Sequence, residues 1–176
     1  DTLLALGGWD AWNVTEDADL GLRLAREGHH IAAIAEPTLE EAPVSLGVWA
    51  AQRSRWIKGH MQTWLVLMRA GKAARRELGL AGFVSTQVIF GGAVLAALCH
   101  GPIMLVCLAL LVSGTMSLDL AGAAFLASGY AVSALGAALA PFRCDRYRLL
   151  AVLTMPLYWP LHSLAAARAV YGLIKA

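Results

Sequence analysis

Four neighbouring residues in the first part of the chain have side chains that acid–base chemistry could use. Thr15, Glu16 and Asp17 stand together, and Asp19 follows two positions later. A carboxylate held near the start of a helix can act as a general base, taking the proton from a hydroxyl group as its oxygen attacks. The same residue types are also typical of an ordinary helix cap. The residues alone do not choose among Glu16, Asp17 and Asp19.

A second polar group, Gln52, Arg55 and Trp56, follows further along the chain. Arginine can meet the charge of a diphosphate with a forked pair of hydrogen bonds. Glutamine can hydrogen-bond hydroxyl groups, and tryptophan offers a flat apolar face. With Trp49 and Gly59, Gln52 and Trp56 recur at intervals of three or four residues, which predicts one shared helix face. The alternative is an amphipathic helix whose Trp and Arg lie at a membrane surface.

The order and spacing of these groups, ahead of a long apolar tail, resemble those of membrane-embedded family 2 glycosyltransferases, the cellulose-synthase-like enzymes. In that family a Thr-Glu-Asp triplet precedes a Gln-x-x-Arg-Trp motif, as Thr15–Asp17 precedes Gln52–Trp56 here. The resemblance implies that Asp17 is the catalytic base. It also implies that Arg55 and Gln52 lie by the donor diphosphate and the acceptor, with Trp56 in the acceptor site.

The segment Gly7-Gly8-Trp9-Asp10 is similar to the part of the family that precedes the triplet, where a loop approaches the acceptor. Plain packing is the alternative for Trp9. The substrate-binding residues implied by the resemblance are therefore Thr15, Glu16, Gln52, Arg55, Trp56 and Trp9.

The reaction implied by the resemblance is the inverting transfer of a sugar from a nucleotide-sugar donor to a growing polysaccharide. Export subunits would be further partners of such an enzyme. Two alternatives stay open: a non-processive transferase to a lipid carrier, and a membrane anchor or transport component without enzymatic activity. The length of the product distinguishes the polysaccharide enzyme from the transferase to a lipid carrier. The presence or absence of donor-binding aspartates distinguishes an enzyme from a membrane component without enzymatic activity.

In this family, aspartates in the N-terminal half of a GT-A fold hold the donor and a divalent metal, Mg²⁺ or Mn²⁺. They include an Asp-x-Asp motif, which residues 17–19 match only by their letters because they overlap the triplet. We therefore expect no metal ligand in this chain and a metal held by residues outside it. The chain is interpreted as the C-terminal part of a longer enzyme, inactive by itself.

The composition indicates membrane helices. Hydrophobic residues make up 59% of the chain, against about half in a soluble domain. From Phe83 to Phe142, Asp119 is the only Asp, Glu, Lys or Arg. The predicted fold is α/β plus membrane helices. Residues 1–78 form the C-terminal part of a cytosolic GT-A-like domain, and residues 79–176 form a transmembrane bundle.

Three or four spans are expected in the tail, because the first apolar run could instead lie along the membrane surface. The apolar runs cover residues 82–98, 103–118, 120–141 and 149–174, and His100-Gly101-Pro102 is expected to break the chain between the first two.

The predicted elements of the polar part are two helices, a strand and a loop. The first helix begins near Thr15–Asp17 and ends by Gly28. A strand is expected over His30–Ala35 and a loop over residues 36–44. Ser45 is expected to cap a helix that continues to about Arg69.

The basic residues indicate orientation rather than a nucleic-acid partner. The net charge is only +2, and no basic stripe is present, so we expect no nucleic acid. Basic residues gather just before the first apolar run: Arg69, Lys72, Arg75 and Arg76. Such clusters flank spans on the cytoplasmic side. We therefore expect an integral protein of a bacterial inner (plasma) membrane, embedded in the lipid bilayer, with residues 1–78 in the cytosol.

Overall fold

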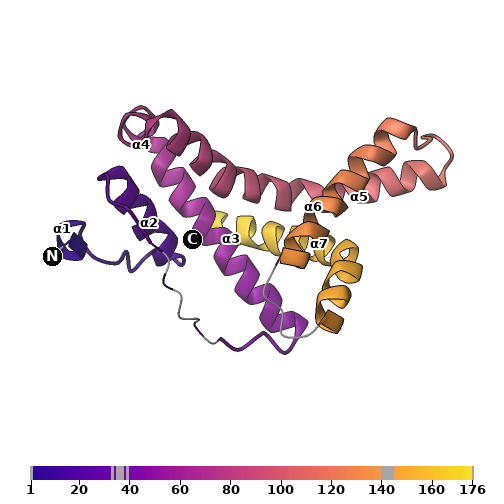
Figure 1. Ribbon diagram of the computed structural model, residues 1–176, viewed down its shortest axis with the longest axis horizontal. Coiled ribbons are helices and arrows are strands. Elements are labelled where there is room, and N and C mark those ends of the chain that lie inside the picture. Colours follow the sequence, from indigo (N-terminus) through magenta and orange to yellow (C-terminus); the bar gives the residue numbers. More distant parts are fainter. Residues whose placement is uncertain (1, 33, 35–37, 39, 140–144, 176) are drawn as a thin grey trace. The chain divides into compact units, whose positions relative to one another are not determined.

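The computed structural model describes residues 2–32, 34, 38, 40–139 and 145–175 of the chain (Figure 1). The chain divides into two compact units, Asp1–Leu98 with Leu164–Ala176, and Cys99–Ser163. The elements are α1 (Thr2–Ala5), α2 (Glu16–Arg26), α3 (Leu46–Arg69), α4 (Gly71–Thr86), the π-helix η1 (Gln87–Gly92), α5 (Ala93–Val112), α6 (Leu120–Leu139) and α7 (Asp145–Ile174).

The structure contains no β-strand in the residues it describes, so the strand predicted over His30–Ala35 is wrong there. His30–Ala32 and Ile34 have no regular structure, and Ala33 and Ala35 lie outside the described residues. A strand is stable only when a neighbouring strand satisfies its backbone groups. No such neighbour exists among the described residues, and a short apolar run cannot reveal this lack. The α/β character expected for this part of the chain is therefore not seen.

The loop predicted over residues 36–44 has neither helix nor strand at Thr38 and Glu40–Val44. Glu36, Pro37 and Leu39 lie outside the described residues.

The two helices predicted for the polar part are confirmed. α2 begins at Glu16, and Gly28 follows it with a φ of 77°, a conformation that glycine adopts readily. α3 begins after Ser45, whose Oγ accepts a hydrogen bond from the Val48 N–H at 3.3 Å, and it ends at Arg69. The Ser45 cap of α3 and the acidic first turn of α2 are local signals, which explains why the sequence alone predicts both starts.

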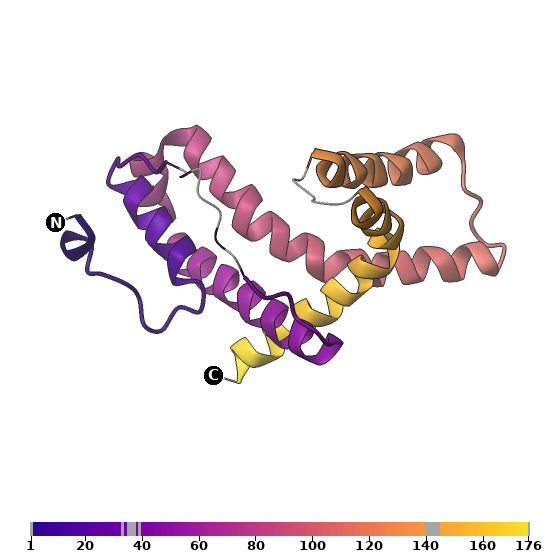
Figure 2. The same ribbon diagram turned by 60° about the horizontal axis from the view of Figure 1, so that its bottom comes forward.

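Three helices of the first unit contact α3: α2, α4 and η1 (Figures 1 and 2). α2 also contacts α4. The buried residues of α3 are Ser54, Gly59, Met61, Thr63 and Leu67. Three of these five are small or polar, so backbones and polar side chains can approach α3 closely.

One helical stretch, Gly71–Val112, with a kink at Gly79, replaces the two predicted apolar runs 82–98 and 103–118. The predicted break at His100-Gly101-Pro102 is wrong, because α5 continues through Pro102. Pro102 has no N–H, so it removes one hydrogen bond of the helix ladder. Membrane helices tolerate such a proline, and α7 contacts the helix beside it, where the Gly101 N–H donates to Ser163 Oγ at 2.8 Å.

Within the described residues, three helices are long and apolar enough to cross a membrane: Gly71–Val112, Leu120–Leu139 and Arg146–Ile174. They indicate association with a membrane. α7 continues through Pro156 and Pro160, as membrane helices tolerate.

Candidate functional site

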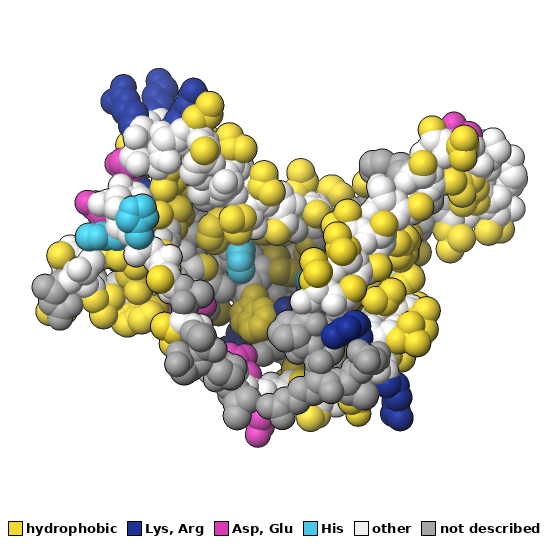
Figure 3. All heavy atoms as spheres, in the orientation of Figure 1, with side chains coloured by type: hydrophobic (Ala, Val, Ile, Leu, Met, Phe, Trp, Pro, Cys, Tyr) yellow, Lys and Arg dark blue, Asp and Glu magenta, His cyan; other side chains and the backbone are white. Residues whose placement is uncertain are grey.

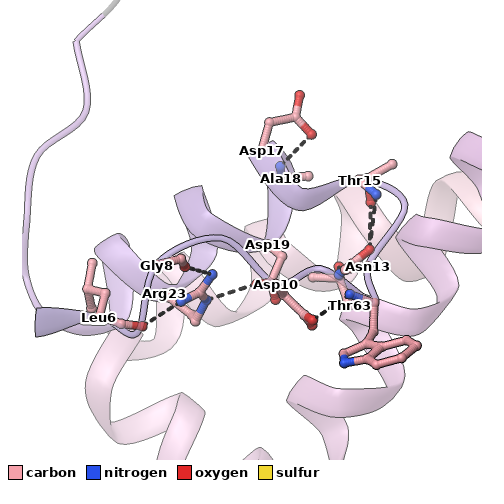
Figure 4. A network of polar contacts seen from close by, with 11 residues as sticks. Leu6, Gly8, Asp10, Asn13, Thr15, Asp17, Ala18, Asp19, Arg23 and Thr63 are labelled. Atoms are coloured by element: carbon pink, nitrogen blue, oxygen red, sulfur yellow. Dashed lines mark hydrogen bonds and ion pairs between the residues drawn. The ribbon is translucent and has the colours of Figure 1, made fainter. Parts of the chain in front are cut away.

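The side chain of Thr15 does not cap α2. Thr15 is only 6% exposed, and its hydroxyl makes no capping bond to the helix. Its N–H and its Oγ1 both donate to Asn13 Oδ1, at 3.1 and 3.3 Å (Figure 4). The ordinary helix-cap interpretation therefore does not describe this side chain. Thr15 belongs instead to a polar contact with α3.

That contact joins the start of α2 to α3 and involves four residues: Asn13, Thr15, Gly59 and Thr63. Asn13 Nδ2 donates to Thr63 Oγ1 at 2.7 Å, and both residues are buried. Thr15 packs directly on the backbone of Gly59. A Cβ atom at Gly59 would overlap Thr15 Oγ1 and come within 2.6 Å of its Cγ2. We call these four residues the α2–α3 latch. Gly59 and Thr63 lie one helical turn apart, so they present one face to α2.

The surroundings of Asp17 and Asp19 differ. Asp19 Oδ2 accepts a hydrogen bond from Arg23 Nε at 2.8 Å, and its side chain is 13% exposed. Asp17 is exposed, and its Oδ1 accepts only the N–H of its neighbour Ala18, at 2.8 Å. In Figure 4 Asp17 points away from the ion pair of Asp19 and Arg23. Asp19 is thus held in an ion pair, whereas the Asp17 carboxylate is exposed and makes no ion pair among the described residues.

Arg23 also fixes the glycine-rich segment that carries Trp9. Its Nη1 donates to Leu6 O at 2.6 Å, and its Nη2 donates to Gly8 O at 2.9 Å. Gly7 and Gly8 have φ values of 82° and 74°, which other residues rarely adopt. The side chain of Trp9 remains 54% exposed beside this clamp. The segment predicted to approach an acceptor is therefore held on α2.

Gln52 and Arg55 line one open hollow of about 410 Å³ at the N-terminal half of α3. The hollow is lined by Glu41, Ala42, Pro43, Val44, Val48, Ala51, Gln52 and Arg55. Trp56 does not line it. The guanidinium of Arg53 lies over the Trp56 ring, with Cζ 4.5 Å from the ring centroid, as in a cation–π contact.

The structure thus brings some predicted site residues together and leaves others apart. Gln52 and Arg55 share the hollow, and Thr15 contacts the same helix through Gly59. In the part of the chain that is described, no hydrogen bond or ion pair links Asp17 to Gln52, Arg55 or Trp56. The latch is what relates the two groups, through the backbone of α2 and α3.

Several residues of the site were missed by sequence reasoning. Arg23 follows Asp19 by four positions, a spacing that favours a helical ion pair and could have revealed it. Asn13 and Thr63 are separated by 50 residues and carried no local signal. Lys58 was also missed. Its Nζ donates to Gly172 O at 3.0 Å, in the last turn of α7, where carbonyl groups lack helical partners.

The described residues do not fit a divalent metal by themselves. They contain no group of three His, Cys, Asp or Glu side chains placed to hold a metal ion. The letters Asp-x-Asp at positions 17–19 do not form a metal pair either, because Asp19 is paired with Arg23 and Asp17 points away.

Comparison with known proteins shows the family of this chain. Residues 1–171 match the family described as glycosyl transferase family group 2, and the chain belongs to that family. It is 41% identical over 56 residues to the probable glycosyltransferase YdaM of Bacillus subtilis (strain 168), a match that covers 31% of this chain. It is 35% identical over 63 residues to the beta-monoglucosyldiacylglycerol synthase of Synechocystis sp. (strain ATCC 27184 / PCC 6803 / Kazusa), covering 35% of this chain.

The chain spans 13% of the length of each of these two curated relatives. No solved structure matches it.

Proposed function

We propose that the protein carrying this chain transfers a sugar from a nucleotide-sugar donor to an acceptor at a membrane, inverting the anomeric centre. The α2–α3 latch is the observation that carries this proposal. It fixes the start of α2, with the exposed carboxylate of Asp17, on the helix that carries Gln52 and Arg55. Group transfer requires a base and a phosphate-binding group in fixed positions, and packed helices can hold them there.

In the proposed step, Asp17 accepts the proton of the acceptor hydroxyl as that oxygen attacks the anomeric carbon. The new C–O bond forms as the bond to the diphosphate breaks, and the nucleoside diphosphate leaves with the electron pair. Arg55 offers the diphosphate a forked pair of hydrogen bonds. Gln52 hydrogen-bonds sugar hydroxyls, and Trp56 and Trp9 contact the acceptor. The ion pair that engages Asp19 supports the choice of Asp17.

The proposal extends to parts of the protein beyond the described helices. Residues 1–78 belong to a cytosolic GT-A-like α/β domain, with strands and Mg²⁺ or Mn²⁺ ligands supplied by residues outside this chain. Residues 79–176 form the membrane region, in a bacterial inner membrane. No step above depends on the metal.

A growing polysaccharide is the first candidate acceptor, supported by the Gln-x-x-Arg-Trp motif and the long apolar helices. Export subunits would then be partners. A lipid acceptor is the second candidate. It is supported by the relative named beta-monoglucosyldiacylglycerol synthase, at 35% identity over 63 residues.

The test uses membranes that contain the full-length protein carrying this chain. Labelled sugar from a panel of nucleotide-sugars is followed into polymer and into extractable lipid, for wild type and Asp17→Asn. General-base catalysis accelerates a reaction by about 10²–10⁴-fold, so Asp17→Asn should lower the transfer rate by a factor of at least about 10². Glu27→Gln, an exposed carboxylate just past α2, is the control and should keep its rate.

Polymer and lipid products separate the two acceptors. Equal rates for wild type and Asp17→Asn would remove Asp17 as the base. A wild-type protein that transfers no sugar from any donor would contradict the transferase proposal and favour a membrane component without enzymatic activity.

A further inference from the structure

We propose that the start of α4 is a binding surface for the headgroups of anionic phospholipids. Figure 3 shows Lys and Arg side chains gathered over this part of the molecule. The surface, which we call the basic patch, consists of Arg69 at the end of α3 and of Lys72, Arg75 and Arg76 in the first turns of α4, all exposed.

The helix directs the basic patch outward. Lys72, Arg75 and Arg76 are three and four positions apart, so they share one face of the first turns of α4. Ala74 lies on the opposite face and is fully buried, at 0% exposed. The helix is therefore anchored by a small apolar residue while its charged face remains available.

The charge of the basic patch is not neutralised within the described residues. Glu77 is the acidic residue on the same two turns of α4. Its Oε2 is paired with Arg26 Nε of α2 at 2.6 Å, to one side of the patch. None of the four basic side chains takes part in an ion pair in this part of the structure. Four positive charges thus face outward together, and they require anions from elsewhere.

The place of the basic patch along the chain identifies those anions. Gly79 has a φ of 69° and a ψ of 175°, so it separates the charged turns from the helix that follows. From Leu80 to Leu118 there is no Asp, Glu, Lys or Arg, and Leu80, Val84 and Val88 are 62, 50 and 64% exposed. An apolar helix that starts directly after four basic residues brings them to the level of lipid headgroups.

Phospholipid phosphates therefore fit the basic patch better than an acidic protein would, because they lie at that level on a membrane. Lys and Arg bind phosphate with charge-assisted hydrogen bonds. Each basic residue near an anionic surface contributes about fivefold in affinity. This inference concerns lipid binding and holds whether or not the protein transfers a sugar.

The test measures lipid preference directly. The full-length protein is reconstituted in symmetric vesicles, and electron paramagnetic resonance of spin-labelled lipids gives the binding of phosphatidylglycerol relative to phosphatidylcholine. Wild type should prefer phosphatidylglycerol, and the preference should fall as salt is raised. Arg75→Gln should reduce it by up to about fivefold, and neutralising all four residues should abolish most of it.

Two variants keep the inference open to refutation. Replacing Arg69, Arg75 and Arg76 by lysine preserves the charge and should preserve the preference. Arg53→Gln removes a positive charge of α3 that lies 16 residues before Arg69 and outside the apolar helices, so it should leave the preference unchanged. A four-residue glutamine variant with the same helix content and an undiminished preference would overturn the inference. So would an equal loss in Arg53→Gln.

Discussion

Gly59→Ala perturbs the α2–α3 latch at its most crowded point. The added methyl group would overlap Thr15 Oγ1 and lie 2.6 Å from its Cγ2 and 2.9 Å from its Cβ. All three atoms belong to a side chain that is 6% exposed and hydrogen-bonded to Asn13. Neither partner can move without disturbing the start of α2, where Asp17 lies.

The size of the effect follows from two opposing terms. Overpacking in a buried contact costs about 1–3 kcal/mol. Alanine has a higher helix propensity than glycine, which returns up to about 1 kcal/mol. The net loss of stability should therefore be about 0–3 kcal/mol. The effect on rate should be larger, because a shift of about 1 Å in a catalytic group costs about 10²-fold.

The assay compares kcat, the KM for the donor and the thermal unfolding temperature in detergent. Gly47→Ala is the matched control, because it makes the same change in α3 where the added Cβ meets nothing within 4 Å. It should be as active as wild type and at least as stable. Gly59→Ala should lose kcat, with a smaller change in donor KM, because Gln52 and Arg55, the proposed donor contacts, do not touch the added methyl group.

A double variant tests whether Thr15 transmits the effect. Thr15→Ala removes Oγ1 and Cγ2, so Gly59→Ala should cost less in that background than in wild type. If Gly59→Ala matches Gly47→Ala in both rate and stability, the latch does not position Asp17. If Gly59→Ala costs the same with and without Thr15→Ala, the clash is not with Thr15.

Three further predictions concern contacts that the sequence did not reveal. Thr63→Val leaves Asn13 Nδ2 without its acceptor, and a buried donor without a partner lowers the free energy of unfolding by about 1–3 kcal/mol. Thermal unfolding measures this loss, and no change would show that water or another group replaces the Thr63 hydroxyl. Arg23→Gln loses three contacts, to Asp19, Leu6 and Gly8, whereas Arg26→Gln loses one partly exposed ion pair. Arg23→Gln should therefore lower the unfolding temperature more. Equal effects would show that Arg23 does not hold the glycine-rich segment on α2. Gly91→Ala places a Cβ 2.9 Å from two atoms of the Trp64 ring and should lower the free energy of unfolding by about 1–3 kcal/mol. Gly92→Ala should lower it less, because the nearest neighbour of its Cβ is 3.6 Å away. The reverse order would contradict the packing of η1 on α3.

The sequence predicted the helices of the first unit because their signals are local. The Ser45 cap, the stop at Gly28 and the acidic first turn of α2 each act within a few residues. It failed at the described residues of His30–Ala35 and at Pro102 because both depend on neighbours in space. A strand needs a neighbouring strand. The helix that continues through Pro102 contacts α7, where Gly101 N–H donates to Ser163 Oγ, and neither kind of neighbour is visible in a local pattern.

The sequence by itself determined that this chain has helical elements, a basic segment and long apolar helices, and that two short motifs similar to those of a glycosyltransferase family occur in order. These properties depend on residue type, periodicity and spacing, which a linear pattern records. Only the tertiary structure decided that Thr15 contacts Gly59 rather than capping its helix, and that Arg23 engages Asp19 while Asp17 stays exposed. Hydrogen bonds and close packing act over a few ångströms in space. A contact such as that of Asn13 with Thr63, 50 positions apart, therefore exists only once the chain has folded.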